Sequence, residues 1–375
     1  MAGIYLHIPF CKQACHYCDF HFSTSTQNQD DIINAIISEI ELREGYLKDK
    51  LIETIYFGGG TPSLLTGGQV KKMLDKIREV YSVGQNAEIT LEANPDDLNY
   101  IKLEQLKQVG INRLSIGIQS FIERDLSFMN RSHTKDQATK CVSNAQAIGF
   151  DNISIDLIYG VPNQTNEEWR NNLRQAISLN IQHISSYCLT VEPKTTLAHM
   201  VKKKQVLQVT DEVAEKQFKM LIETLAENGF EQYEISNFAK GGFISLHNSN
   251  YWKGVEYIGL GPSAHSFDGN SRQWNFANNN RYMKSLENAN LDFEREILTE
   301  EQKYNEYILT NLRTKWGLDE NQIIQRFSLK ISDFFQKEVK KHQKDGFLIQ
   351  NQKLFKLTNK GQFLADRIAS DLFYI

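Results

Sequence analysis

Three of the five cysteines lie within eight residues of one another, at Cys11, Cys15 and Cys18. Thiolates are soft ligands, and a group of them selects iron–sulfur clusters or zinc. Most [4Fe–4S] clusters use four cysteines, so three would leave one iron open to a small chelating molecule. A structural zinc site completed by His16 or His21 is the alternative, but zinc sites usually present Cys-x2-Cys pairs. The spacing therefore favours an iron–sulfur cluster with one open position.

A run of glycines, Gly58-Gly59-Gly60-Thr61-Pro62, follows a segment that is predicted to be a strand. Glycines allow backbone N–H groups to come close to a ligand. A Gly-rich turn is by itself weak support for a site, and no Walker lysine follows, which excludes a P-loop. At the carboxyl end of a barrel strand, where ligand sites gather, the turn becomes a candidate binding loop.

Four polar residues follow or end other predicted strands. Taken singly, such side chains are mostly exposed surface or capping groups. As a set they would occupy the rim of successive strands, where barrel sites are built. They are Glu92, Gln119, Arg131 and Asp156.

The residues up to about 190 alternate short apolar runs with amphipathic stretches, and this order predicts right-handed βαβ units and a parallel sheet. The predicted strands are Gly3–Ile8, Leu51–Phe57, Glu88–Glu92, Arg113–Ile118, Asn152–Leu157 and His183–Leu189. The predicted helices between them are Asp31–Leu42, Gln69–Tyr81, Asp97–Val109, Lys135–Ile148 and Glu167–Leu179. Six units are too few for a closed eight-stranded barrel. We therefore predict an α/β fold with an open, partial (β/α)6 TIM-like barrel.

The chain divides into three predicted parts: the partial barrel at 1–190, a less regular barrel extension at 191–298, and a C-terminal domain at 299–375. The last part reads as three helices followed by two short strands, which predicts a winged-helix-like α+β domain. It holds 13 Lys+Arg and 10 Asp+Glu, a net charge of 13 − 10 = +3. A winged helix with so small a charge does not predict DNA binding, because fold alone does not assign function.

Composition narrows the class of protein. The 375 residues carry 42 Lys+Arg and 46 Asp+Glu, a net charge of −4, which argues against a strongly basic nucleic-acid-coating protein. No apolar run approaches the ~20 residues of a membrane helix. The N-terminus, MAGIYLHIPF, lacks the basic and apolar regions of a secretory signal. We expect a cytoplasmic protein with reduced thiols, in which Cys141 and Cys188 are buried bystanders.

The Cys-x3-Cys-x2-Cys spacing, with Tyr17 before the last cysteine, resembles the signature of the radical S-adenosylmethionine (SAM) superfamily. The resemblance implies a [4Fe–4S] cluster on Cys11, Cys15 and Cys18, with SAM chelating the open iron and cleaved to a 5′-deoxyadenosyl radical. It also implies that Asp156 binds the ribose hydroxyls and Arg131 the carboxylate of SAM, and that the segment 259–266 faces the SAM region. The full set of implied SAM-binding residues is Tyr5, Gly59, Gly60, Thr61, Glu92, Gln119, Arg131 and Asp156.

Within the superfamily, the stretch GIYLHIPFCKQACHYCDF resembles the oxygen-independent coproporphyrinogen III oxidase group. The true oxidases carry a fourth cysteine two residues after the third, where this chain has Phe20. The segment His247-Asn248-Ser249-Asn250-Tyr251-Trp252 resembles the HNxxYW pattern of the HemW-type heme chaperones. The resemblance implies heme binding by His247, Tyr251 and Trp252. Without it, a lone histidine in a hydrogen-bonded turn would be the favoured interpretation.

The resulting hypothesis is a heme chaperone that carries a [4Fe–4S] cluster and SAM and passes heme to an acceptor protein. The acceptor could be membrane-associated, and a homodimer is compatible with the resemblance. We expect neither coproporphyrinogen oxidase activity nor a nucleic-acid partner. Two alternatives stay open at this point: oxidative decarboxylation of coproporphyrinogen III by a radical SAM mechanism, and an iron–sulfur-dependent nucleic-acid binder.

Overall fold

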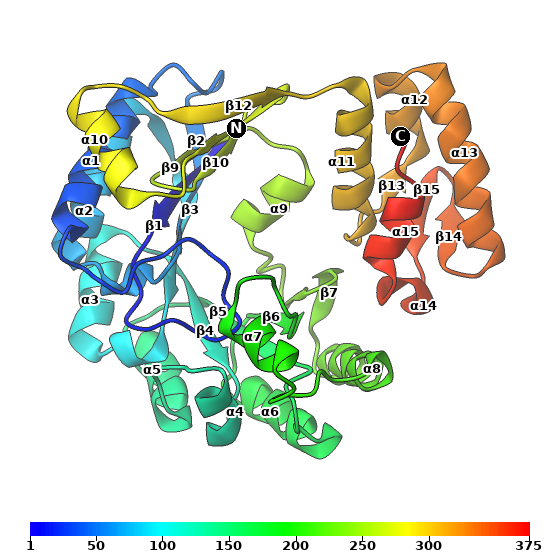
Figure 1. Ribbon diagram of the computed structural model, residues 1–375, viewed down its shortest axis with the longest axis horizontal. Helices are drawn as coiled ribbons and strands as arrows, with labels where there is room; N and C mark the ends of the chain where they lie inside the picture. The colour runs from blue at the N-terminus through cyan, green and yellow to red at the C-terminus, as the bar shows by residue number, and fades with distance from the viewer.

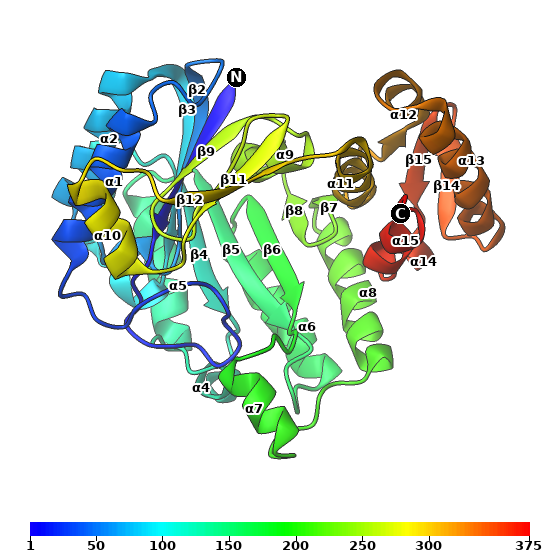
Figure 2. The ribbon, with the colours of Figure 1, turned by 45° about the horizontal axis from the view of Figure 1, so that its top comes forward.

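The computed structural model describes residues 1–375 and contains a single large mixed sheet. Six consecutive parallel strands form its centre, in the order in which they occur in the sequence, and their sheet curves around a common interior (Figures 1 and 2). The sheet does not close, because its outermost strands do not pair with each other. The predicted partial barrel is confirmed. The six strands are β1 (Ala2–Ile8), β2 (Leu51–Gly59), β3 (Ser82–Ala93), β4 (Arg113–Gln119), β5 (Asn152–Tyr159) and β6 (His183–Cys188).

Helices cover the outer face of these strands. Three of them begin with a capping box, in which Thr66, Thr134 or Thr165 exchanges hydrogen bonds with the residue three positions on. Gly110 ends α3 in the left-handed conformation, with φ 105°, a common C-terminal cap. The helices are α1 (Gln29–Leu42), α2 (Gly67–Val80), α3 (Tyr100–Val109), α4 (Glu123–Phe128), α5 (Lys135–Ala147), α6 (Asn166–Ser178) and α8 (Asp211–Glu227).

The segment 191–298 extends the sheet at both edges. At one edge β9 pairs parallel to β1, and β10, β11 and β12 follow in antiparallel order. At the other edge β8 pairs antiparallel to β6, and β7 lies outside it. These strands were not predicted, because each has only three to five residues. The bounds are β7 (Glu231–Glu234), β8 (Asn237–Ala239), β9 (Tyr257–Leu260), β10 (His265–Phe267), β11 (Ser271–Asn275) and β12 (Phe293–Ile297), with helices α7 (Thr196–Lys202), α9 (Leu246–Trp252) and α10 (Asn279–Glu287).

The barrel strands place apolar side chains outward, against the helices, and polar side chains inward. The His183 ring, for example, is fully buried between the hydroxyls of Ser154 and Tyr233, each 2.7 Å from a ring nitrogen. Glu88 and Arg113 are also buried in the interior, 3.9 Å apart. The interior of the barrel is therefore lined by polar side chains, some of them paired and others, such as Arg113 Nε and Nη1, without a hydrogen-bond partner.

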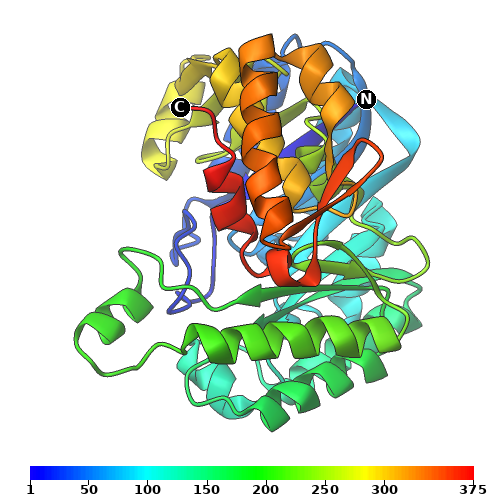
Figure 3. The ribbon, with the colours of Figure 1, turned by 90° about the vertical axis from the view of Figure 1, so that its right-hand side faces the viewer.

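The C-terminal residues form a body with a hydrophobic core of its own, beside the barrel (Figures 1 and 3). Its first three helices and its antiparallel strands confirm the predicted winged-helix-like architecture, with one strand, β13, and two short final helices in addition. Arg313 joins the two bodies, because its guanidinium pairs with Glu234 and its carbonyl accepts from Ile235 N–H. The elements are α11 (Glu300–Leu312), β13 (Leu318–Asp319), α12 (Glu320–Arg326), α13 (Leu329–Lys344), β14 (Leu348–Asn351), β15 (Leu354–Leu357), α14 (Asn359–Gln362) and α15 (Ala365–Asp371). No helix in the structure has both the length and the apolar character that crossing a membrane requires.

Candidate functional site

The cysteine loop leaves β1 and is fastened to the segment that follows α4. His16 N–H donates to the carbonyl of Met129, 3.1 Å away, and the His16 ring contacts the carbonyl of Phe128 at 2.8 Å. In the same region the Asn130 amide donates to the carbonyl of Ala14 at 2.7 Å. These bonds fix the loop at the carboxyl end of the barrel strands, the end at which barrel sites are built.

The three thiols of the loop are free and partly buried. The Thr61 hydroxyl donates to Cys11 Sγ at 3.3 Å, and Arg131 Nη1 donates to Cys15 Sγ, also at 3.3 Å. Burial raises the pKa of Cys18 to about 11. Binding of a metal centre to this loop would therefore release protons.

The donor set fits a cluster better than a single metal ion. No three His, Cys, Asp or Glu side chains converge as the ligands of one ion do. A cubane does not require such convergence, because each cysteine binds a different iron atom. The histidines of the zinc alternative are otherwise engaged: the His16 ring is bonded to Phe128, and the His21 ring lies 2.7 Å from Asn279 Oδ1. The structure thus favours the cluster hypothesis over zinc.

The glycine turn after β2 lies against the cysteine loop. Gly60 N–H donates to the carbonyl of Ile8 at 2.9 Å, and Thr61 N–H donates to the carbonyl of Phe10 at 2.6 Å. Gly59 has φ 101°, and a Cβ at this position would lie 2.5 Å from the His7 ring. Only glycine fits this conformation without strain, so the turn is shaped by its close approach to the His7 ring and the backbone after β1. Ligand binding by this turn stays a prediction.

Glu92 lies beside this turn. It accepts hydrogen bonds from the Tyr56 hydroxyl at 2.8 Å and from Gly59 N–H at 3.2 Å. Burial, with a smaller contribution from the charge of Asp156, raises the pKa of Glu92 to about 7. A carboxyl in this state gains stability from a cationic ligand, because the ligand replaces lost hydration.

Arg131 reaches the same region from the segment after α4. Its Nη2 donates to Asn94 Oδ1 at 2.6 Å and to the carbonyl of Gly117 at 2.7 Å, while its buried Nε has no partner. Gln119 lies nearby, with a left-handed φ of 67° that non-glycine residues rarely adopt. An unsatisfied buried donor of a guanidinium is a group that an anionic ligand can satisfy.

Asp156 lies inside the barrel on β5. Burial raises its pKa to about 6, while the nearby Arg113 and the hydroxyls of Ser185 and Ser115 oppose that rise. Tyr5, on β1, has its hydroxyl 3.2 Å from His7 Nδ1. The structure therefore gathers the eight predicted SAM-binding residues around the mouth and upper interior of the barrel. Asn94, the partner of Arg131, was missed because an Asn before Pro reads as an ordinary turn.

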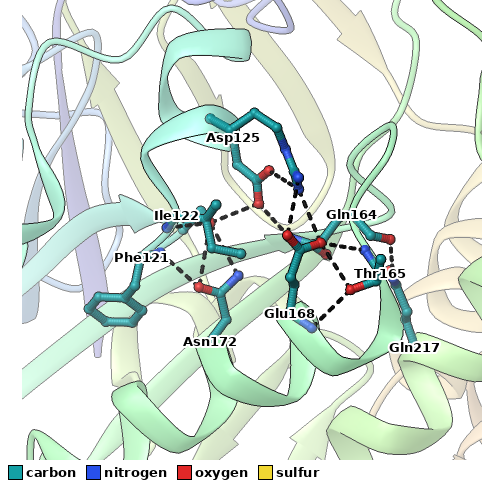
Figure 4. A network of polar contacts seen from close by, with 10 residues as sticks. Phe121, Ile122, Asp125, Gln164, Thr165, Glu168, Asn172 and Gln217 are labelled. Atoms are coloured by element: carbon teal, nitrogen blue, oxygen red, sulfur yellow. Dashed lines mark hydrogen bonds and ion pairs between the residues drawn. The ribbon is translucent and has the colours of Figure 1, made fainter.

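A buried polar network supports the Arg131 segment from outside the barrel (Figure 4). Asp125, at the start of α4, is fully buried and accepts from the Ser120 hydroxyl at 3.1 Å and the Gln164 amide at 2.7 Å. Asn172 accepts from Phe121 N–H at 2.8 Å. The network connects the loops after β4 and β5 to α6. It thereby fixes the position of the segment after α4, which contains Arg131 and is bonded to the cysteine loop.

A cavity of about 1280 Å³ lies between the barrel mouth, the extension and the C-terminal domain. That volume is above the range of ordinary small-ligand pockets. The cysteine loop contributes Phe20, which is 66% exposed. Tyr251 and Trp252, from the predicted heme-binding segment, also line the cavity. Its aromatic walls suit a flat ligand, and charged side chains of both signs, four cations and three carboxylates, border it.

His247, the histidine of the predicted heme-binding segment, does not line the cavity. Its side chain is buried, with Nδ1 2.8 Å from the Thr54 hydroxyl and Nε2 2.9 Å from the Tyr251 hydroxyl. The ring also stacks on Tyr56, with centroids 4.9 Å apart. Because both nitrogens are engaged, coordination of heme iron by His247 would require at least one of these hydrogen bonds to break, and heme binding by His247 stays a prediction. In this conformation His247 positions Tyr251, which does reach the cavity.

Comparison with known proteins agrees with this geometry. Residues 5–176 match the radical SAM superfamily, and residues 298–364 match the HemN C-terminal domain. The solved structure of coproporphyrinogen III oxidase (HemN) from Escherichia coli superposes with a TM-score of 0.85 at 24% identity, over 99% of this chain and 90% of that one. The barrel, the cysteine loop and the C-terminal domain thus define a protein of the radical SAM class with a HemN-like fold.

The sequence relatives define the family more narrowly. The chain is 33% identical to the heme chaperone HemW of Bacillus subtilis, over 98% of both chains. It is 32% identical to the heme chaperone HemW of Mycobacterium tuberculosis, over 99% of this chain and 94% of that protein. The chain belongs to the HemW family.

Proposed function

We propose that the chain is a heme chaperone: it binds heme in the cavity between the barrel and the C-terminal domain and passes it to an acceptor protein. The observation that carries the proposal is the cavity itself, whose walls include Tyr251 and Trp252 of the segment that resembles the HemW pattern. The full-length similarity to proteins named heme chaperones supports the same function. Phe20, in place of the fourth cysteine of the oxidases, adds an apolar face to the cavity.

The flat aromatic walls suit the faces of a porphyrin, and the cations suit its propionates. Lys253, Lys303 and Arg326 border the cavity without an ion pair to a carboxylate of the protein, although Lys303 donates to Asn270 Oδ1 at 2.9 Å. Such free cations favour an anionic ligand, since no internal pair has to be broken to bind it.

The proposal includes a [4Fe–4S] cluster held by Cys11, Cys15 and Cys18, with SAM at the iron that lacks a cysteine. When bound, this group supplies one-electron redox chemistry. The residues of the chain have separate roles around it. Glu92 compensates the positive charge of SAM, while Arg131 donates its free Nε–H to the SAM carboxylate. Asp156 accepts from the ribose hydroxyls, and Gly59, Gly60 and Thr61 shape the turn against which SAM lies.

The proposed activity belongs to the cytoplasm, where thiols such as those of Cys11, Cys15 and Cys18 stay reduced and available to a cluster. The C-terminal domain forms one wall of the cavity, so its position relative to the barrel controls access to bound heme. The proposal also includes a membrane-associated acceptor protein and a homodimer of the chain.

A hemin titration followed by transfer to an apo-hemoprotein tests the proposal. We expect saturable binding with a shifted Soret band, and movement of that heme to the acceptor. Trp252→Ala should weaken binding, whereas Tyr100→Ala, on exposed α3 and remote from the cavity, should not. Absence of a specific Soret shift in the intact protein would contradict the heme function.

A further inference from the structure

The ring of His247 lies between two hydroxyl groups, one at each nitrogen. Thr54 Oγ1 lies 2.8 Å from Nδ1, and the Tyr251 hydroxyl lies 2.9 Å from Nε2. Thr54 is fully buried on β2, whereas Tyr251 lines the cavity. Nε2 is therefore the nitrogen on the cavity side of the ring, and Nδ1 is the nitrogen on the barrel side.

Close packing fixes the ring in this position. Tyr56 stacks on the His247 ring, with centroids 4.9 Å apart and an interplanar angle of 24°. A Cβ at Gly3 would lie 2.9 Å from Thr54 Oγ1 and 3.5 Å from His247 Nδ1, so the bond between Thr54 and His247 needs the space that this glycine leaves. The ring is thus held by residues of β1 and β2, two central strands of the barrel, and rigid elements suit a binding group.

The backbone of His247 is fixed as well. Both oxygens of the buried Glu88 carboxylate are used, because one accepts from Leu246 N–H at 3.1 Å and the other from His247 N–H at 3.0 Å. The hydroxyl of Tyr233 accepts from the preceding N–H, that of Ser245, at 3.2 Å. The first turn of α9 is therefore anchored in the barrel interior. Tyr251, one turn further on, is the partner of the His247 ring that can move toward the cavity.

We infer, on the basis of the proposed heme function, that Thr54 is a positioning residue for heme binding: its hydroxyl holds His247 Nδ1 while Nε2 coordinates the heme iron. Nε2 supplies the electron pair of the bond to iron, and its hydrogen bond to the Tyr251 hydroxyl breaks. A neutral imidazole carries one ring hydrogen, so coordination through Nε2 places that hydrogen on Nδ1, where Thr54 Oγ1 accepts it. A hydrogen bond of this kind fixes the tautomer and the orientation of a ligating histidine and raises its basicity.

The neighbouring polar groups cannot take over this role. The Glu88 carboxylate is occupied by the N–H groups of α9, and the Tyr56 hydroxyl donates to Glu92 at 2.8 Å. Thr54 is the group of the protein that is bonded to Nδ1. The sequence did not indicate it, because a threonine in the apolar segment 51–57 reads as an ordinary strand residue.

The test is resonance Raman spectroscopy of ferrous heme bound to the full-length, cluster-loaded protein, with excitation in the Soret band to select the heme. The native chain should show an iron–histidine stretching band, and His247→Ala should abolish it. Thr54→Val keeps the shape of the side chain but removes the acceptor. The band should therefore shift to lower frequency, because a less basic imidazole binds iron more weakly, and hemin affinity should fall roughly tenfold.

Two further variants separate positioning from a general effect on the fold. Thr54→Ser keeps the hydroxyl and should restore both the band frequency and the affinity. Thr90→Val is the matched control, because Thr90 is an equally buried threonine on the adjacent strand β3 whose hydroxyl has no partner, and it should leave the band in place.

Several results would overturn the inference while leaving the heme function intact. They are a native band frequency in Thr54→Val, an equal shift in Thr90→Val, a failure of Thr54→Ser to restore the band, and heme that binds without an iron–histidine band that depends on His247. A band lowered by Tyr251→Phe but not by Thr54→Val would mean that iron binds Nδ1, and it would also overturn the inference. Absence of saturable heme binding by the native chain would overturn the heme function as well.

Discussion

Replacing Glu92 by Gln removes a buried carboxyl whose ionisation the fold disfavours. Burial raises the pKa of Glu92 to about 7, against an ordinary value of 4.5. Between these two pH values the folded protein keeps a proton that the unfolded chain has already released. The free energy of unfolding therefore falls as pH rises from about 4.5 to about 7, and it is not recovered above that range.

The size of the effect follows from the two pKa values. A difference of about 2.5 pH units corresponds to roughly 3 kcal/mol at 1.36 kcal/mol per unit. Solvent at the barrel mouth reduces this value, so we expect about 1 to 3 kcal/mol. Gln keeps the shape of the side chain but accepts fewer hydrogen bonds from Tyr56 and Gly59, which costs about 1 kcal/mol at every pH.

The measurement is urea unfolding of the cluster-free protein at pH 5 and pH 8, for the native chain and Glu92→Gln. The difference in unfolding free energy between variant and native chain should move in favour of Gln by about 1 to 3 kcal/mol from pH 5 to pH 8. Glu104→Gln, on the exposed face of α3, should show no such movement. SAM affinity should fall in Glu92→Gln, since a charged acceptor for a cation is lost. If the difference in unfolding free energy between Glu92→Gln and the native chain did not depend on pH, Glu92 would not have a raised pKa.

Other substitutions test separate parts of the structure. Cys15→Ala should abolish the iron–sulfur absorbance of the reconstituted protein, while His16→Ala should retain it. An intact cluster in Cys15→Ala would mean that the cluster ligands are misassigned. Gly59→Ala should reduce SAM affinity and destabilise the fold by about 1 to 3 kcal/mol, because the new Cβ would contact the His7 ring at a left-handed φ. Titration calorimetry measures the SAM affinity, and scanning calorimetry measures the stability. Phe335→Ala should destabilise the C-terminal core by about 3 to 5 kcal/mol, measured by hydrogen exchange of α13, and unchanged protection there would show that this body has no independent core.

The sequence was sufficient to predict the barrel, because short apolar runs alternate with amphipathic stretches along residues 1–190. It was also sufficient to predict that Glu92, Gln119, Arg131 and Asp156 lie near one another, since the carboxyl ends of parallel strands share one edge of the sheet. Helix α4 was missed because six residues, Glu123–Phe128, are too few for a helical period to be recognised. The paired strands of the extension were missed for the same reason of length.

The cavity could not be predicted in the same way. Its walls come from the cysteine loop, from 251–272 and from the C-terminal domain, and only the packing of the two bodies brings these segments together. The environment of His247 also depends on distant residues, because Thr54 comes from β2 and Glu88, which accepts its N–H, from β3. A local pattern identifies the residue type, but burial and bonding partners follow from the tertiary structure.

The central claim is tested most directly by one anaerobic experiment on protein with a reconstituted cluster, SAM and a reductant. One portion receives hemin and then an apo-hemoprotein acceptor, and the other receives coproporphyrinogen III. We predict that heme is bound and transferred in the first portion and that no protoporphyrinogen forms in the second. Production of protoporphyrinogen, without saturable heme binding, would contradict the chaperone function and establish the oxidase alternative.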